Sequence, residues 1–306
     1  MTVTPVAQGL TSHSGNLTPE IWSGRAIVKF YDATVFAAIS NSDYTGLIKN
    51  MGDTVHIRTV PDITISDYSI GMTLTYEKPT ATVVDLLIDQ GHYYAFSISD
   101  VEKLQSDMQY VEDWTDDAGE QLADTVDTAI LAAVFSDAHA SNQGATAGVN
   151  SSSIDLGAST VAESVDKTNI LDYIVDMGTV LDEQSVPDSG RWLVMPPIFC
   201  GLLKKSDLKD AALSGDATSI MRNGKLGTVD RFTIYSSNNV ATTTDTDTIQ
   251  NVIFGHPSAL TFASQLVKNE TLKNPNDFGD LLRGLQVYGY KVVQSKALGW
   301  FYAKKG

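Results

Sequence analysis

Two stretches in the middle of the chain decide the fold. Residues 181–197 read Leu-Asp-Glu-Gln-Ser-Val-Pro-Asp-Ser-Gly-Arg-Trp-Leu-Val-Met-Pro-Pro, and residues 223–239 read Asn-Gly-Lys-Leu-Gly-Thr-Val-Asp-Arg-Phe-Thr-Ile-Tyr-Ser-Ser-Asn-Asn. They predict a helix end, a Pro/Gly turn, a buried strand at Trp192–Met195, a helix opened by prolines, a glycine-rich loop and a strand at Phe232–Tyr235. This order of elements is typical of a structural protein. None of these residues forms a pattern that is typical of an active site.

The flanking segments extend this α+β pattern. Apolar residues at helical spacing from Ile170 to Leu181 predict an amphipathic helix that ends before Pro187. The helix after Pro196 is expected to run to about Lys205. Asn251–Phe254 reads as a further strand, and the last 22 residues alternate again. Residues 139–160 are rich in Ala, Ser, Thr, Gly and Asn without periodicity, which predicts a surface loop or a small irregular insertion.

The first third of the chain changes from helical spacing to a period of two. Apolar residues between Trp22 and Ile39 predict a short amphipathic helix. From Thr54 to Ser97 apolar and polar residues alternate, which predicts a hairpin-rich β segment. The strands are expected around Val55–Thr59, Leu74–Tyr76, Val83–Ile88 and Tyr93–Ile98. A long two-stranded ribbon is marginally stable alone, so this segment needs a partner surface.

A single very long helix is predicted next. Ser99-Asp100-Val101-Glu102 fits a capping box, and apolar spacings of three and four persist to about Asp137. A continuous helix of that extent would be about 57 Å long. Between residues 100 and 127 it carries ten acids and one base, Lys103, so most of its surface is an acidic, solvated face. Gly119 is the weak point at which it could bend.

Composition excludes several classes of function. The chain of 306 residues has a formal net charge of −16, which disfavours a protein that neutralises nucleic-acid phosphates. Its single cysteine, Cys200, excludes an internal disulfide and indicates folding in a reducing compartment. Residues 1–24 lack the features of a secretory signal, and no run is apolar enough to cross a membrane. We therefore expect a bacterial-type cytoplasmic setting, with no membrane partner.

The candidate catalytic and ligand-binding motifs in the sequence are weak. Gly224-Lys225 lacks the Ser or Thr of a phosphate loop because Leu226 follows, and Ser164–Lys167 lacks the companions of a Ser-x-x-Lys enzyme. The five histidines show no metal-ligand spacing. Cys200 is expected to be an inert core thiol. Trp22, Trp114, Trp192 and Trp300 are expected to be core or interface anchors. We predict no catalytic residue, no cofactor and no metal site.

The order of elements, with residue matches along nearly the whole chain, resembles the tailed-bacteriophage major capsid protein with the Hong Kong 97-type fold. The matching residues are Trp22-Ser23, Gly52–Val55, Ser97–Asp107, Leu181-Asp182, Val186-Pro187, Arg191-Trp192, Val194–Pro197, Gly224, Leu226-Gly227, Phe232–Asn238 and Tyr288–Val292. One departure is Asp230, where the resemblance leads us to expect a glycine before the strand.

The resemblance implies five segments of an α+β capsid fold. They are an N-terminal arm (1–50), an extended β-hairpin loop (51–98), the spine helix and peripheral domain (99–165), an axial domain (166–270) and returning peripheral strands (271–306).

The resemblance also implies a structural role without enzymatic activity. Copies would form hexamers and pentamers of an icosahedral virion shell, assembled in the host cytoplasm around DNA that is bound without sequence specificity. Because the chain begins almost directly at the arm, a separate scaffolding protein is implied, together with a portal protein; a decoration protein is a further candidate. The candidate subunit-interface residues are Trp22, Asp67, Tyr68, Tyr76, Lys78, Asp210 and Arg222.

Contacts across symmetry axes are expected at the hairpin tip, Ile63–Thr75, and at the loop Ser206–Asn223. A covalent cross-link from Lys78 to an asparagine of a neighbour, as in one branch of the family, is a disfavoured variant of this assembly.

Two alternatives stay open from the sequence. An encapsulin-type nanocompartment shares the fold and would bind cargo peptides inside its shell. A soluble acidic hydrolase would use carboxylates of the region Asp113–Asp124, which include Asp116 and Glu120. Paired catalytic carboxylates need one raised pKa, which requires burial, and these acids are too dense on one helix for most to be buried.

Overall fold

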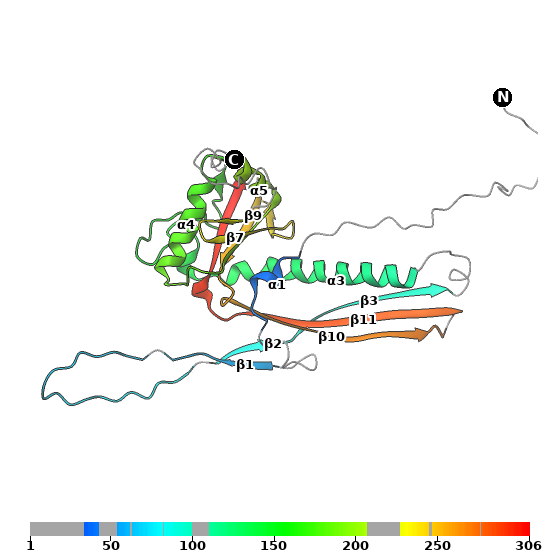
Figure 1. Cartoon of the computed structure of the whole chain (residues 1–306), viewed down its shortest axis with the longest axis horizontal. Coiled ribbons are helices and arrows are strands. Elements are labelled where there is room, and N and C mark those ends of the chain that lie inside the picture. The colour runs from blue at the N-terminus through cyan, green and yellow to red at the C-terminus, as the bar shows by residue number, and fades with distance from the viewer. Residues whose placement is uncertain are drawn as a thin grey trace, which may run out of the picture.

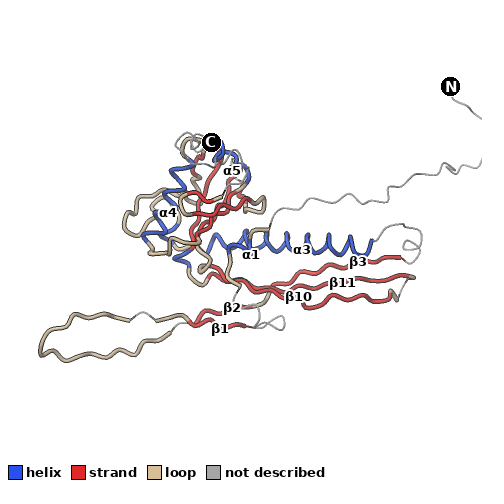
Figure 2. The backbone as a smooth tube through the Cα atoms, in the orientation of Figure 1, coloured by secondary structure: helices blue, strands red, loops and turns tan. Residues whose placement is uncertain are grey.

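The computed structural model of the chain describes residues 34–42, 54–61, 63–81, 83–99, 110–206, 227–244, 247–275 and 277–306. A compact α/β part lies at one end, and an elongated part holds a long helix above long strands (Figure 1). A narrow hairpin leaves the elongated part and projects beyond the body, mostly as loop (Figure 2). The molecule is therefore a thin, extended subunit.

The compact part is built around a mixed sheet, which we call the axial sheet. Its strand order is β4-β12-β9-β5-β7-β6, with β8 also paired to β9. β5 pairs in parallel with β7, and β12 with β4; the other pairs are antiparallel. The strands are β4 Glu163–Val165, β5 Arg191–Met195, β6 Thr228–Val229, β7 Phe232–Ser236, β8 Thr242–Thr244, β9 Thr248–Gly255 and β12 Leu298–Lys305.

Local sequence patterns explain the elements of this part. All five residues of β5 are buried, as its continuous apolar run predicts for a central strand. Helix α4, Ile170–Glu183, ends before Pro187, and helix α5, Pro197–Lys205, begins directly after Pro196. The predictions for these elements, and for the strands at β7 and β9, are confirmed.

The long helix α3 spans Tyr110–Val134 and continues as a 3₁₀ turn, Phe135–Asp137. Its 25 residues make it about 37 Å long. The predicted helix is thus confirmed from Tyr110 onward, whereas residues 100–109 lie outside the described residues. The buried stripe of α3 repeats at helical spacing and consists of Leu122, Val126, Ile130, Leu131 and Val134.

Beneath α3 lies an antiparallel sheet in the order β10-β11-β3, which we call the long sheet. Its strands are β3 Gln90–Ser99, β10 Leu260–Lys273 and β11 Gly279–Val292. β3 and part of β11 were predicted as strands, but β10 was not. The predicted boundary at residue 270 falls inside β10, and β12 returns to the axial sheet.

The β hairpin is only partly paired. β1, Thr54–Arg58, pairs antiparallel with β2, Val83–Leu87. The strand predicted at Leu74–Tyr76 is wrong, because residues 63–81 belong to no strand and instead form an extended loop with a turn at Ile70-Gly71. The prediction that groups β3 with the hairpin is also wrong, since β3 joins the long sheet.

Two further expectations change. Of the helix predicted between Trp22 and Ile39, the described part is α1, Phe36–Ile39. Of the two alternatives for residues 139–160, the surface loop is wrong and the small irregular insertion is confirmed, because this irregular segment packs against the axial sheet through buried residues. Asn142 is fully buried and donates from Nδ2 to the carbonyl oxygens of Lys296 and Leu298 at 2.8 and 2.9 Å, and Leu156 is also fully buried.

Candidate intersubunit surfaces

The extended loop 63–81 is the most exposed apolar surface in the described part of the chain. Every residue from 63 to 81 is exposed. Its exposed large apolar side chains are Ile63, Ile65, Tyr68, Ile70, Met72, Leu74 and Tyr76. Clustered exposed apolar residues mark interaction sites in soluble proteins, so this loop is a candidate contact surface.

A few internal contacts shape the loop. Met72 donates its backbone N–H to the Ser69 carbonyl at 3.2 Å, and Gly71 between them has a φ of +90°. This positive φ suits glycine at the second central position of a type II turn. Nearer the base, the Thr64 N–H donates to Glu77 Oε1 at 2.7 Å. These contacts hold the two legs of the loop near each other without a strand ladder.

Four of the predicted interface residues, Asp67, Tyr68, Tyr76 and Lys78, lie together on this loop and are exposed. The other three, Trp22, Asp210 and Arg222, lie outside the described residues. The structure therefore places the described candidates on one element, and their role in contacts stays a prediction.

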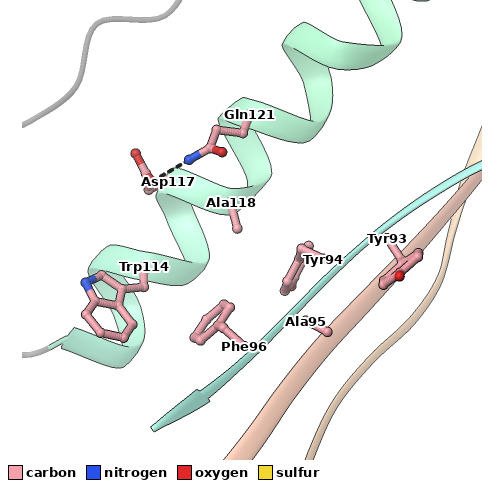
Figure 3. Close-up of a pocket in the computed structure, with 8 residues that line it drawn as sticks. All are labelled: Tyr93, Tyr94, Ala95, Phe96, Trp114, Asp117, Ala118 and Gln121. Carbon is pink, nitrogen blue, oxygen red and sulfur yellow. Dashed lines mark hydrogen bonds between the residues drawn. The ribbon is translucent and has the colours of Figure 1, made fainter.

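An aromatic groove lies between α3 and β3 (Figure 3). It has a volume of about 560 Å³ and is lined by Tyr93, Tyr94, Ala95, Phe96, Trp114, Asp117, Ala118 and Gln121. The Phe96 and Trp114 rings meet edge to face with centroids 5.9 Å apart. Asp117 accepts a hydrogen bond from Gln121 Nε2 at 2.7 Å. The groove is lined by packing surfaces and holds no nucleophile paired with a base, so it fits contact rather than catalysis.

Asp116 and Glu120, the acids of α3 that the hydrolase alternative names, are not placed as a catalytic pair needs. Asp116 and Glu120 are exposed, and no group of three metal-binding side chains comes together among the described residues. Exposed carboxylates lack the desolvation that a general acid requires. The hydrolase alternative thus finds no support in the described part of the acidic helix.

Asp127 differs from these acids because it is 1% exposed. Its Oδ1 accepts the backbone N–H groups of Val35 at 3.1 Å and Phe36 at 2.9 Å, which begin α1. Its Oδ2 accepts from Asn239 Nδ2 at 3.1 Å. Burial raises the pKa of Asp127, and the hydrogen bonds from Asn239 and the backbone oppose this shift in part. The carboxylate joins three segments and is a structural group that the sequence did not single out.

Arg191 organises the turn before β5. Its side chain is fully buried and donates to the carbonyl oxygens of Pro187, Gly178 and Val186, at 2.9, 3.2 and 2.7 Å. Its Nη2 also lies 2.7 Å from Asp182 Oδ1. Burial acts to raise the pKa of Asp182, but hydrogen bonds from Arg231 and Arg191 outweigh it, so the pKa is lowered.

The turn at Asp230-Arg231 explains the departure noted in the sequence. β6 and β7 pair through Val229 and Phe232, which leaves a two-residue turn. Asp230 and Arg231 have φ angles of 41° and 68°. Positive φ at both central residues defines a type I′ turn, in which Asn-Gly, Asp-Gly and Gly-Gly are favoured, so aspartate can take the first central position that the resemblance gives to glycine.

The remaining side chains that the sequence singled out are packed groups. Cys200 is buried, and desolvation raises the pKa of its thiol, which fits the predicted inert cysteine. Trp192 is buried, while Trp300 donates from Nε1 to Asn251 Oδ1 at 3.1 Å. Within the described residues, no helix is both long enough and apolar enough to span a membrane.

The long helix over a long sheet, the compact axial part and the projecting apolar hairpin together define the class of Hong Kong 97-type shell proteins. Residues 83–303 match the family described as "Phage capsid protein". The chain belongs to this phage capsid protein family.

Solved capsid structures share the fold. A chain from Mycobacterium phage Che8 is 30% identical, with a TM-score of 0.74 over 94% of this chain and 97% of that chain. A chain of the cyanophage P-SCSP1u capsid is 17% identical, with a TM-score of 0.69 over 95% and 94%. One of the bacteriophage PhiM1 mature capsid is 18% identical, with a TM-score of 0.66 over 94% and 92%. None of the curated proteins matches the sequence.

The family membership sets the function. The chain is a structural major capsid protein that assembles with copies of itself into the shell of a virion, and it is not an enzyme. The prediction of the fold class and of this function is confirmed. The family match supports neither of the two alternative functions, the encapsulin-type shell or the soluble hydrolase.

Proposed function

We propose that this chain forms the hexamers and pentamers of an icosahedral shell around double-stranded phage DNA, and that the extended loop of each subunit lies on a neighbouring subunit. The observation that carries the proposal is the loop 63–81, in which every residue is exposed although seven carry large apolar side chains. Burying such side chains is favourable by roughly 1.5–3 kcal/mol each. Assembly supplies the surface that the isolated chain lacks.

Charge shapes this assembly. At a net charge of −16, subunits repel one another at low salt, so contacts between them must rest on apolar burial and strand pairing. The same negative charge lets the shell enclose DNA without adhering to it. We expect assembly to be favoured by salt, which screens the repulsion while leaving apolar burial intact.

The finer partners follow from the family resemblance. We propose that a separate scaffolding protein guides assembly in the cytoplasm of the bacterial host, that a portal protein occupies one vertex, and that a decoration protein is a further candidate. On the subunit itself, Asp67, Tyr68, Tyr76 and Lys78 are the described candidate contacts. Covalent joining through Lys78 would appear as oligomers on a boiled denaturing gel, and we expect monomer.

A loop-shortened variant tests the proposal. The paired base of the hairpin allows residues 60–81 to be replaced by a short turn that leaves β1 and β2 intact. Purified protein, alone and co-expressed with a candidate scaffolding protein, is sedimented and viewed by negative-stain electron microscopy. We expect shells or curved sheets from the unmodified chain, and folded small species from the variant. Particles of equal yield and diameter from the variant would refute the role of the loop.

A further inference from the structure

The aromatic groove between α3 and β3 follows the edge of a strand. Four consecutive residues of β3, Tyr93 to Phe96, line it. Because the side chains of a strand alternate between its two faces, four consecutive residues border one groove only along the edge of the strand. Tyr94 and Phe96 point from β3 toward α3, so the groove lies between this edge and the long helix (Figure 3).

This edge of β3 is open at Tyr93–Phe96 in the sheet that the described residues form. β3 is the last strand in the order β10-β11-β3 and pairs with β11 along its other edge. In an antiparallel pair, alternate residues of each strand direct their N–H and C=O groups away from the partner strand. An open edge of this kind is a template for one more strand, and extended peptides bind proteins by adding to such an edge.

Aromatic rings form the wall beside this edge. The Tyr94 and Phe96 rings stack with centroids 6.1 Å apart, and the Phe96 ring meets Trp114 of α3 edge to face. The Tyr94 ring lies against Gly284 of β11, where an added Cβ would come within 2.4 Å of the ring carbons, so this glycine makes room for the ring. Tyr93 and Trp114 are 76% and 41% exposed, which leaves aromatic surface open to a partner.

The charges around the groove favour a basic occupant. Asp117 lies on the groove wall, and neither α3 nor β3 contains a lysine or an arginine. Arg283 of β11 lies opposite Ala95, but its side chain is bound to Glu270 of β10, across the sheet from β3. A cation that lies over an aromatic ring and beside a carboxylate is attracted by both groups.

We propose that the aromatic groove binds an extended, basic segment of a different protein, which adds a strand to the edge of β3 at Tyr93–Phe96 and places a lysine or arginine side chain between the Trp114 ring and Asp117. Apolar side chains of the segment cover Tyr94 and Phe96. A second copy of this chain fits less well, because each copy has a net charge of −16 and copies repel. This inference goes beyond the proposed function and does not depend on the extended loop.

Synthetic peptides test both the charge and the strand. A short peptide of alternating valine and arginine is titrated into unassembled subunits at physiological salt, and calorimetry gives its dissociation constant. A peptide with glutamate in place of arginine should bind more than about tenfold more weakly. Methylation of the backbone nitrogens keeps the charge but removes donors, and it should weaken binding about tenfold. If the methylated peptide, or an uncharged peptide of valine and threonine, bound as tightly as the arginine peptide, the proposal would be overturned. The second result would indicate an apolar occupant, such as a second copy.

Two neighbouring acids of α3 provide a matched pair of variants. Asp117 lines the groove, whereas Asp116 is exposed and does not line it. Asp117→Asn and Asp116→Asn remove the same charge from the same helix, and asparagine at position 117 can still accept from Gln121. We expect Asp117→Asn to weaken binding of the arginine peptide about fivefold, and Asp116→Asn to change it less than about twofold.

Trp114→Leu keeps an apolar side chain but removes the ring face, and it should also weaken binding of the arginine peptide about fivefold. Urea unfolding of each variant confirms that the subunit remains folded. Equal losses from Asp116→Asn and Asp117→Asn would show a general attraction to the acidic helix, and the groove would not be the binding site. Unchanged binding to the Trp114 variant would exclude the contact between the cation and the ring.

Discussion

Asn239 donates a hydrogen bond from Nδ2 to Asp127 Oδ2 across 3.1 Å and so joins the loop after β7 to the middle of α3. The same carboxylate receives the two backbone N–H groups at the start of α1. The Phe36 ring of α1 in turn meets Phe262 of β10 edge to face, with centroids 4.6 Å apart. One buried side chain therefore ties the axial part and the long helix to α1.

Replacing Asp127 by alanine should destabilise the unassembled subunit by about 2–3 kcal/mol, because buried N–H groups of Val35 and Phe36 lose their acceptor. Urea unfolding of purified subunits measures the change. The matched control is Asp116→Ala, an exposed acid of the same helix, which we expect to stay within about 0.5 kcal/mol of the unmodified chain. Equal effects of both substitutions would show that the contacts of Asp127 with α1 and Asn239 contribute nothing to stability.

The buried carboxyl group of Asp127 also makes the stability of the folded subunit depend on pH. Burial raises the pKa of Asp127 in the folded chain above the ordinary value of 3.8, so the folded state holds this proton more tightly than the unfolded state. Its contribution to stability is therefore largest below pH 3.8 and declines as the pH rises towards the folded-state pKa. Asp127→Asn does not titrate. Relative to that variant, the unmodified chain should lose stability with rising pH across this window, and an opposite trend in urea unfolding would refute the assignment.

Arg191 and Arg231 share the partners Asp182 and Asp188 but differ in burial. The Arg191 side chain is fully buried, while that of Arg231 is 37% exposed. Arg191→Met should cost about 3–5 kcal/mol, because it leaves buried carbonyls and Asp182 without their donor. Arg231→Met should cost no more than about 1 kcal/mol, as for an exposed ion pair. Chemical denaturation measures the free energy of unfolding of the two variants. Similar losses of stability would contradict the argument that the buried arginine contributes more than the exposed one.

The sequence predicts those elements whose pattern is local. The apolar run of β5 lies between Gly190 and Pro196, and α4 and α5 have helical spacing and clear ends. Strand β10 was not predicted, because the alternation of apolar and polar residues along it is interrupted. A register shift between Leu266 and Lys268 changes which residues share a face, so no single period runs through the strand.

The errors at the hairpin and at Asp127 have a different cause. Leu74 and Tyr76 alternate as in a strand, yet residues 63–81 form no ladder and are all exposed, so the local pattern does not reveal that the described part of the chain offers them no partner strand. Asp127 is one acid among ten in its region of the sequence. Its contacts come from residues about 90 to 110 positions away, so no local pattern marks it.

The turn at Asp230 offers a test of backbone strain. A left-handed conformation costs a residue other than glycine roughly 1 kcal/mol, whereas glycine adopts it freely. Asp230 has a φ of 41°, and its carboxylate lies 3.8 Å from Arg231 Nε on a partly exposed surface. Asp230→Gly should therefore stabilise the subunit by about 0.5–1 kcal/mol in urea unfolding, since the released strain exceeds a weak ion pair. Asp230→Ala is the control: it removes the same carboxylate but keeps the strained Cβ, and it should not stabilise. If alanine and glycine gave equal gains, the carboxylate and not the backbone would be the source of the strain.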